Sequence, residues 1–288
     1  MSTRHRTHLV AMLVATGAAL ALGGVGAGCS SGSQMSAIVD AGPPGTCPMN
    51  PDDLISDFMM DNSVVAVNGR SGGWYLYPTM DPTTGDPNGM FDPPLPMGKD
   101  PYPIDTTMGN PYCSGPGSFH TKATNFGVFG AALATDFVPR MSDTVKGSYD
   151  ASMYAGISFW ARGAKAIKHV QIQFPDIYTD AEGMAAPDAC VLATGFPNNC
   201  SPYLVKLGED ADMTKYMPVK IGTSWKQIKI YFADTIQDQY NPGAMSPGNK
   251  LDLKHLLGMA IQVNKNYDVT PPTPNDFEIW IDDVEFFR

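Results

Sequence analysis

The sequence predicts an all-β protein built as a sandwich of two antiparallel sheets. Glycine and proline are abundant, at 29 and 25 of the 288 residues, while helical periodicity is nearly absent. Apolar and polar residues instead alternate in short segments, which is the pattern of strands with one buried face. Residues 53–288 are enough for one large sandwich with long Pro/Gly-rich loops.

The first 28 residues predict a secretory signal peptide. Arg4 and Arg6 precede an apolar run from Leu9 to Leu22, and small residues follow up to Gly28. The run is short and its far flank is rich in glycine, so it fits a cleaved signal better than a membrane-spanning helix. The chain is therefore expected to be exported.

Residues 29–52 predict a tether. The segment from Gly26 to Cys29 resembles a bacterial lipoprotein cleavage box, although Gly26 stands where leucine is usual. Cys29 would then be the lipidated residue, and Ser30–Ser33 would begin a flexible linker. This interpretation places the protein in the cell envelope, in the outer membrane or periplasm or at the cell surface. The alternative is an ordinary signal peptide that leaves Cys29 without a role.

The first half of the domain carries fewer strand signals than the second. Structure is expected to begin near Asp53. Strands are expected at Ser63–Val67, Trp74–Tyr77, Phe119–Thr124 and Gly127–Ala134. Between the second and third of these, Pro78–Ser118 is dense in proline, glycine, aspartate and methionine. A loop of that length in a compact domain is usually functional or disordered.

The second half predicts five further strands. They are Gly156–Arg162, Val170–Phe174, Trp225–Phe232, Leu257–Asn264 and Phe277–Arg288. One helical turn is expected at Leu251–Leu256. The alternation in these strands places six side chains between the two sheets: Ile157, Phe159, Ile172, Ile230, Phe277 and Ile279.

The last strand holds an aspartate in an unexpected place. Phe277, Ile279 and Ile281 share a face, and continued alternation puts Asp283 on the same face. An unpaired carboxylate among buried apolar groups is costly. Asp283 is therefore either turned away by a β-bulge or matched by a partner, for which a cation is the obvious candidate.

Five cysteines agree with export. Setting Cys29 aside leaves an even number, which suggests two disulfides in an exported chain. Cys190 and Cys200 flank a loop rich in glycine, proline and asparagine and form the expected local pair, so Cys47 with Cys113 follows by elimination. A zinc site is a poor alternative, because no Cys-x-x-Cys pair occurs and the histidines are scattered.

The net charge excludes some partners. Without Arg4 and Arg6, 17 of the 19 basic residues remain against 29 acidic ones, a net charge of −12. This argues against nucleic acid and against anionic membrane surfaces, so membrane contact is expected only through a lipid anchor. The balance fits calcium and neutral ligands such as glycans. The protein is expected to be a monomer.

An ordered set of segments resembles a known family. The segments are Asp57-Phe58, Gly73–Tyr77, Tyr154–Arg162, the Cys190–Cys200 loop, Trp225 and Phe277–Phe286. Together they resemble galactose-binding-like jelly rolls and are similar to family 11 carbohydrate-binding modules and related bacterial lipoproteins, from about Leu54 to Arg288. The resemblance implies a non-catalytic jelly-roll domain that binds polysaccharide on a concave sheet, with a structural calcium at one edge. Met59 departs from it, since such modules often carry an acidic residue there.

The strand parities give candidate ligand-binding residues. Inward isoleucine, valine and phenylalanine side chains leave a set of tryptophan, amide and arginine side chains facing outward. The predicted sugar-binding residues are Trp160, Trp280, Gln171, Gln173 and Arg162. Rings stack on the C–H faces of sugars, and planar polar groups hydrogen-bond their hydroxyls. The alternative is that the loop from Pro78 to Ser118 covers both tryptophans, which then only extend the core.

A calcium ion is the predicted cofactor, with a structural role. Asp283 is the expected ligand, with Asp57 as a second one. Calcium prefers several oxygen ligands, which aspartates provide.

Two features of the sequence could indicate an enzyme. Gly69–Gly73 matches Gly-x-Ser-x-Gly, but a nucleophile elbow needs a helix next, and Trp74–Tyr77 predicts a strand. Carboxylates are plentiful in the loops, but nothing marks one glycosidase pair. The leading hypothesis is therefore a tethered, non-catalytic carbohydrate-binding domain. A structural or protein-interaction lipoprotein without a sugar site is the alternative, favoured by a face that the long loop covers, and a glycoside hydrolase is the third.

Overall fold

A computed structural model describes residues 50–78, 88–95, 102–110, 113, 115–142, 145–183, 190, 200–208, 216–217, 219–237 and 246–288. The chain divides into two units, Met1–Gln34 and Met35–Arg288, and every described residue belongs to the second. Within the described part, no helix has the length and apolarity needed to cross a membrane. The signal peptide, Cys29 and Cys47 lie outside the described residues, so the boundaries 1–28, 29–52 and 53–288 stay predictions.

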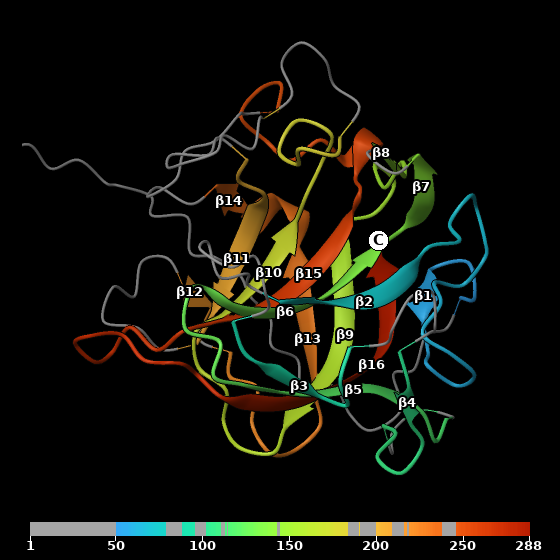
Figure 1. Ribbon diagram of the computed structural model, residues 1–288. Coiled ribbons are helices and arrows are strands. Elements are labelled where there is room, and N and C mark those ends of the chain that lie inside the picture. Colours follow the sequence, from blue (N-terminus) through green and yellow to red (C-terminus); the bar gives the residue numbers. More distant parts are fainter. Residues whose placement is uncertain are drawn as a thin grey trace, which may run out of the picture. The chain divides into compact units, whose positions relative to one another are not determined.

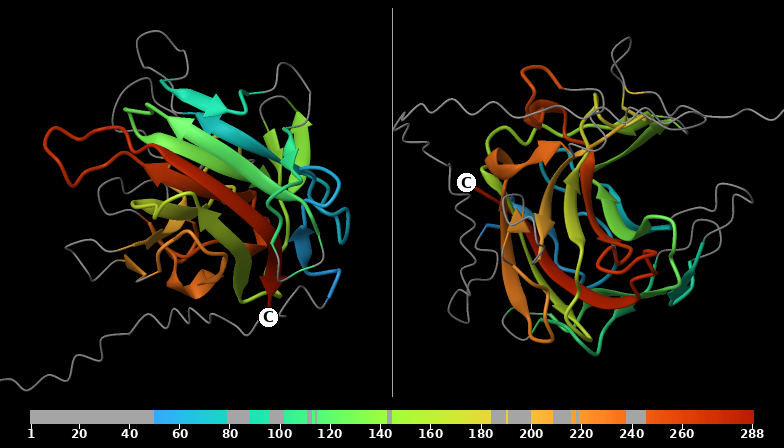
Figure 2. Two further views of the ribbon diagram at one scale, coloured as in Figure 1. Left: turned by 90° about the horizontal axis from the view of Figure 1, so that it is seen from below. Right: turned by 90° about the vertical axis from the view of Figure 1, so that its left-hand side faces the viewer.

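The described residues form an all-β, jelly-roll sandwich of two large sheets (Figure 1). The first, called sheet A, has the order β13 (Lys226–Tyr231), β9 (Gly156–Gly163), β16 (Phe277–Phe287), β5 (Ser118–Thr124) and β3 (Met90–Asp92). Two short strands join it, β1 (Leu54–Ser56) on β16 and β4 (Ile104–Asp105) on β5. In Figure 2 the red C-terminal strand β16 can be followed to the C-terminus beside the green strand β5, its antiparallel partner.

The second, called sheet B, contains the other long strands. Its order is β12 (Tyr216–Met217), β11 (Tyr203–Leu207), β10 (Val170–Phe174), β15 (Gly258–Asn264), β6 (Gly130–Asp136) and β2 (Gly73–Pro78), with β14 (Ile236–Gln237) on β11. All pairings are antiparallel except that of β11 with β12. Figure 1 shows β10, β11 and β15 side by side.

Shorter elements complete the fold. β7 (Val138–Ser142) and β8 (Val145–Gly147) form a separate hairpin. Two 3-10 helices are described, η1 (Phe232–Asp234) and η2 (Leu253–His255), and the second confirms the turn expected at Leu251–Leu256. The strand expected at Ser63–Val67 is wrong, because only Ser63 forms a single bridge, to Gly73. The region from Pro78 to Ser118 is more structured than expected, since it contributes β3 and β4.

The core lies between the two sheets. The six side chains predicted there are all buried: Ile157, Phe159, Ile172, Ile230, Phe277 and Ile279. The four strands that carry them all match the expected bounds to within one residue. Removal of these large apolar groups from water stabilises the sandwich, and the close packing fixes how the two outer faces are presented.

Candidate functional site

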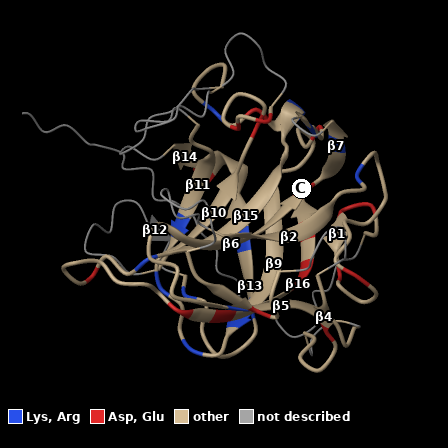
Figure 3. Ribbon diagram, viewed as in Figure 1, with Lys and Arg blue, Asp and Glu red and all other residues tan. Residues whose placement is uncertain are grey.

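The outer face of sheet B has tyrosine at one edge and amides at its centre, with Lys206 of β11 beside Gln171 and Asp136 at the end of β6. Val170, Ile172 and Phe174 point into the core, so Gln171 and Gln173 of β10 point outward. The same alternation turns Ala260, Gln262 and Asn264 of β15, Ala132 and Ala134 of β6, and Tyr75 and Tyr77 of β2 to this face. In Figure 3 strands β10 and β15 are tan along their length, because they carry no charged residue.

Strand register arranges these residues in two rows across the sheet. One row runs Gln171, Gln262, Ala132, Tyr77, and the next runs Gln173, Ala260, Ala134, Tyr75. Neighbours in such a row have Cβ atoms about 5 Å apart. The alanines therefore form a low floor between the tyrosines on one side and the amides on the other. We call this surface the amide–tyrosine face.

The amides are hydrogen-bonded to one another. Nε2 of Gln173 donates to Oε1 of Gln171 at 3.2 Å and to Oε1 of Gln262 at 3.0 Å. Nε2 of Gln262 donates in turn to Oδ1 of Asn264. All four side chains are half-buried. Each bond fixes one end of a side chain and leaves other donors and acceptors for a ligand, so less conformational entropy is lost on binding.

The two tyrosines differ in freedom. Tyr77 is 60% exposed. Tyr75 is half-buried and its hydroxyl donates to Oδ1 of Asp136 at 3.1 Å. Burial, with nearby Asp136 as the next cause, raises the pKa of Tyr75 above its usual value, so the phenol stays neutral. Tyr77 thus offers an open ring face, and Tyr75 a fixed one.

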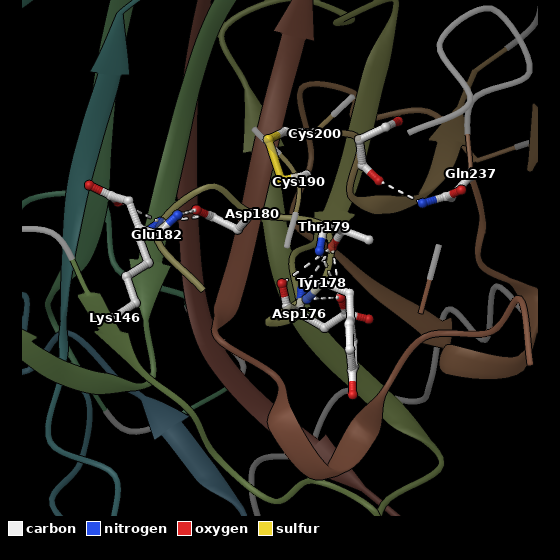
Figure 4. Close-up of a disulfide and its surroundings, with 10 residues drawn as sticks. Lys146, Asp176, Tyr178, Thr179, Asp180, Glu182, Cys190, Cys200 and Gln237 are labelled. Atoms are coloured by element: carbon white, nitrogen blue, oxygen red, sulfur yellow. Dashed lines mark hydrogen bonds and ion pairs between the residues drawn. A yellow bond between two sulfur atoms is a disulfide. The ribbon is translucent and has the colours of Figure 1, made fainter. Parts of the chain in front are cut away.

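A charged network closes this face at the end where Asp136 lies. Nζ of the buried Lys146 lies 2.9 Å from Oδ2 of Asp180, 3.5 Å from Oε2 of Glu182 and 3.6 Å from Oδ1 of Asp136. Arg140 binds Glu182 through two hydrogen bonds of 2.7 Å. Figure 4 shows Lys146, Asp180 and Glu182 on one side of the loop that follows β10. Burial would lower the pKa of Lys146, but the carboxylates of Asp180 and Asp136 raise it overall, so the ammonium stays charged.

The five predicted sugar-binding residues do not form one platform. Gln171 and Gln173 lie on sheet B, whereas Trp160, Arg162 and Trp280 lie on the outer face of sheet A. The expectation of one shared platform is wrong, because parity fixes which face of a strand a residue occupies but not which sheet the strand joins. A role in binding stays a prediction for each residue.

The outer face of sheet A is covered. Trp160 is 3% and Trp280 7% exposed. Nε1 of Trp280 donates to Oδ2 of Asp105, at 2.9 Å, and Asp105 belongs to the loop region between Pro78 and Ser118. The Trp280 ring stacks on His120, with centroids 4.3 Å apart, and the Arg162 guanidinium lies 5.0 Å from the ring centroid. These rings have little surface left for a sugar, as the alternative interpretation of Trp160 and Trp280 anticipated.

The aspartates at the end of β16 lie on a β-bulge. The register with β9 shifts between Asp282 and Glu285, and Asp283 has a positive φ of 45°. The backbone N–H of Asn110 donates to Asp282 at 2.9 Å, and its side-chain amide donates to Asp283 at 3.0 Å. Of the two explanations for Asp283, the structure shows the bulge.

These carboxylates nevertheless lack a counter-charge within the described residues. No ion pair joins Asp57, Asp282 or Asp283 to a described lysine, arginine or histidine. Burial and the neighbouring Asp283 raise the pKa of Asp282 to about 8, and burial with Asp57 raises that of Asp283 to about 6. Oxygen donors with uncompensated charge fit calcium chemically. The described part of the chain contains no cluster of three or more His, Cys, Asp or Glu side chains that could hold a metal ion. The residues therefore match calcium in the type of donor atom only.

The disulfide prediction is confirmed for one pair. Cys190 and Cys200 are bonded, with Cα atoms 4.9 Å apart (Figure 4). The N–H of Cys190 donates to the carbonyl of Tyr178, which ties the bridge to the loop after β10. Cys113 is disulfide-bonded, but Cys47 lies outside the described residues, so that pairing stays a prediction.

The Gly-x-Ser-x-Gly segment is not a nucleophile elbow. Its Arg70 is 1% exposed, donates to the carbonyls of Asp52 and Leu54 and lies 5.3 Å from the ring centroids of Tyr149 and Phe286. The strand β2 follows directly, where a hydrolase needs a helix. This segment therefore holds the start of the domain against its core.

No protein-family model and no curated protein matches the chain. Among solved structures, a family 11 carbohydrate-binding module of a Clostridium thermocellum cellulosomal cellulase aligns with 12% identity and a TM-score of 0.41, over 81% of this chain and 95% of that one. A family 30 module of another C. thermocellum cellulosomal cellulase aligns with 15% identity and a TM-score of 0.43, over 80% and 95%. A third, a C. thermocellum family 11 module in complex with a β-1,3-1,4-mixed-linked tetrasaccharide, shows 13% identity and a TM-score of 0.39, over 81% and 96%. These identities and scores are low, so what this chain binds has to be argued from its own residues.

Proposed function

We propose that the amide–tyrosine face of sheet B binds a neutral polysaccharide, without catalysis. The observation that carries the proposal is the hydrogen-bonded chain of Gln171, Gln173, Gln262 and Asn264 beside the exposed ring of Tyr77. Sugar hydroxyls exchange water hydrogen bonds for protein ones at modest net gain, so an ordered set of amides gives selectivity and ring stacking gives affinity.

The rows also suggest how a ligand lies. Tyr77, Ala132, Gln262 and Gln171 follow one another across four neighbouring strands. Strands are about 4.8 Å apart, so this row spans roughly 15 Å, the length of about three sugar rings. A chain crossing the strands would stack on Tyr77, pass over the alanine and reach the amides.

The covered face of sheet A favours a different role for its tryptophans. A face covered by the Pro78–Ser118 region was the sign expected of an interaction lipoprotein without a sugar site, and Asp105 and Asn110 from that region do cover sheet A. This supports the alternative function for sheet A only. Trp160, Arg162 and Trp280 then stabilise the fold.

Affinity electrophoresis in a panel of soluble neutral polysaccharides, including a β-glucan, tests the proposal. Tyr77→Ala should weaken retardation about tenfold or more, and Gln173→Ala by less. Tyr231→Ala is the matched control, because Tyr231 is a half-buried tyrosine at the edge strand of sheet A. No retardation by any polysaccharide, or equal effects of Tyr77→Ala and Tyr231→Ala, would contradict it. Release of reducing ends from a bound polysaccharide would contradict the non-catalytic part.

We also propose that Ca²⁺ binds at the β16 bulge through Asp283, with Asp57 as a second ligand. The support is the set of buried oxygen donors without a described counter-charge. An ion there would supply positive charge between carboxylates and would hold the segment around Asn110 against β16.

A further inference from the structure

Asp136 occupies a position on the amide–tyrosine face that the amides and tyrosines do not explain. On β6, Asp136 points to the same outer face as Ala132 and Ala134. Its register partners are Gly73 on β2 and Gly258 on β15, so no side chain from either neighbouring strand stands beside it. The carboxylate therefore lies at the end of the floor between Tyr75 and Lys146, where, of the described side chains, only the tyrosine and the lysine contact it.

Only one of its two oxygens is engaged. Oδ1 accepts the Tyr75 hydroxyl at 3.1 Å and lies 3.6 Å from Nζ of Lys146. Oδ2 accepts no hydrogen bond from a described residue, and it is not among the buried atoms that lack a partner. The side chain keeps 13% of its surface exposed. A fixed carboxylate with one accessible oxygen is a hydrogen-bond acceptor ready for a ligand hydroxyl.

The surrounding charges decide which ligands this end can accept. Three carboxylates, on Asp136, Asp180 and Glu182, face two cations. Lys146 is buried beneath the carboxylates, and Glu182 holds both terminal nitrogens of Arg140. The cluster therefore has a net charge of −1, although the Arg140 side chain is its most exposed member at 42%. Next to the unpaired Oδ2 of Asp136, an anionic ligand group would be repelled.

We propose that Asp136 is a specificity-determining residue that accepts a hydrogen bond from a neutral sugar hydroxyl and rejects glycans bearing carboxylate groups. This inference rests on the proposed function of the same face and adds the class of glycan that it selects. Lys146 and Tyr75 are positioning residues, since each contacts Oδ1 and holds the carboxylate in one orientation.

The test compares a neutral polysaccharide that binds with the same polymer oxidised at its primary alcohols to carboxylates. The native protein should bind the oxidised polymer at least about tenfold more weakly, and added salt should narrow this gap by screening the repulsion. Asp136→Asn keeps the shape and an acceptor for Tyr75 but removes the charge. It should weaken binding of the neutral polymer about tenfold and narrow the gap.

Tyr75→Phe is the matched variant, because it leaves the Asp136 charge in place and should keep the gap. The inference is overturned if Asp136→Asn keeps the native ratio of affinities for the neutral and oxidised polymers, or if it binds the neutral polymer as tightly as the native protein does. It is also overturned if added salt does not change that ratio in the native protein. The native protein alone can overturn the inference, by binding the oxidised polymer as tightly as the neutral one. Because the chain without its first 28 residues has a net charge of −12, only the comparison with Asp136→Asn assigns a weaker binding of the oxidised polymer to this residue. Tyr77→Ala distinguishes failure of this inference from failure of the proposed function. If Tyr77→Ala loses polysaccharide binding while Asp136→Asn binds both polymers as the native protein does, Asp136 has no role in specificity, but the face still binds polysaccharide.

Discussion

At the scale of single residues, burial separates two aromatic side chains that the sequence presents alike. Trp280 and Tyr77 both point outward from their strands. Trp280 is 7% exposed, against His120 and Arg162, whereas Tyr77 is 60% exposed. Alternation predicts the outward direction of each but not the loop that covers one of them. Tyr77 was missed as a candidate because sequence parity gives no sign of which outward ring stays open.

This difference in burial predicts that the two substitutions destabilise the protein by unequal amounts. Trp280→Ala should lower the free energy of unfolding by about 3 kcal/mol, because it removes a buried ring with contacts on both sides. Tyr77→Ala should change it by less than about 0.5 kcal/mol, as expected of an exposed site. Urea unfolding followed by fluorescence measures both. A larger loss in Tyr77→Ala than in Trp280→Ala would show that the exposed ring is the structural one.

At the scale of the element, the alternation of buried residues along β16 shows where its bulge lies. Phe277, Ile279 and Ile281 are buried at odd positions, and Val284 and Phe286 at even ones. Such a change of phase within one strand requires an extra residue, which is Asp283. The sequence contained this signal, because the apolar residues alone show the shift. It could not show that Asn110, far away in the chain, would bind both aspartates.

The buried carboxylate of Asp282 predicts how stability depends on pH. Its pKa is raised from 3.8 to about 8 in the folded protein. Between these values the folded state keeps a proton that the unfolded state releases, so stability falls as pH rises from about 4 to about 8. In EDTA, the melting temperature should therefore be lower at pH 8.5 than at pH 5 by more in the native protein than in Asp282→Asn. Equal slopes in the two proteins would contradict this.

Calcium provides the second arm of that experiment. At pH 8.5, adding Ca²⁺ to the EDTA-treated protein should raise the melting temperature, since a bound cation stabilises the ionised carboxylates. Asp283→Asn should abolish the response. If neither the chelator nor Ca²⁺ changes the melting temperature of the native protein, the proposed Ca²⁺ site at the bulge is wrong.

The Cys190–Cys200 bridge predicts a further stability effect at this scale. It closes a loop with a sequence separation of 10, and chain-entropy arguments give about 2–3 kcal/mol for a loop of that length. The double substitution Cys190→Ala with Cys200→Ala should lower the free energy of unfolding by that amount in chemical denaturation. Dithiothreitol should destabilise the native protein by more than it destabilises the double variant, in which the disulfide of Cys113 is still present. No difference between native and double variant would show that the bridge adds no stability.

At the scale of the whole molecule, the sandwich and its core could be predicted from sequence, but the division into sheets could not. Alternation identified β9, β10, β13, β15 and β16, and with them the buried residues. It missed β11, because Tyr203, Leu204 and Val205 are all buried and do not alternate with polar residues. Which strands become neighbours depends on long-range pairing, so the amides of β10 could not be assigned to a sheet with the tyrosines of β2.

The predicted lipid anchor is also a property of the whole molecule. Without the predicted signal peptide the chain has a net charge of −12, which disfavours electrostatic attraction to anionic membranes, so the predicted attachment is through a lipid on Cys29. In a bacterial host that processes lipoproteins, the native chain should fractionate with membranes, and Cys29→Ser should move to the soluble fraction. Tyr77→Ala is the control for retention through envelope polysaccharide, and it should stay with the membranes. A soluble native chain, or Cys29→Ser that remains membrane-bound, would refute the anchor and favour an ordinary cleaved signal peptide.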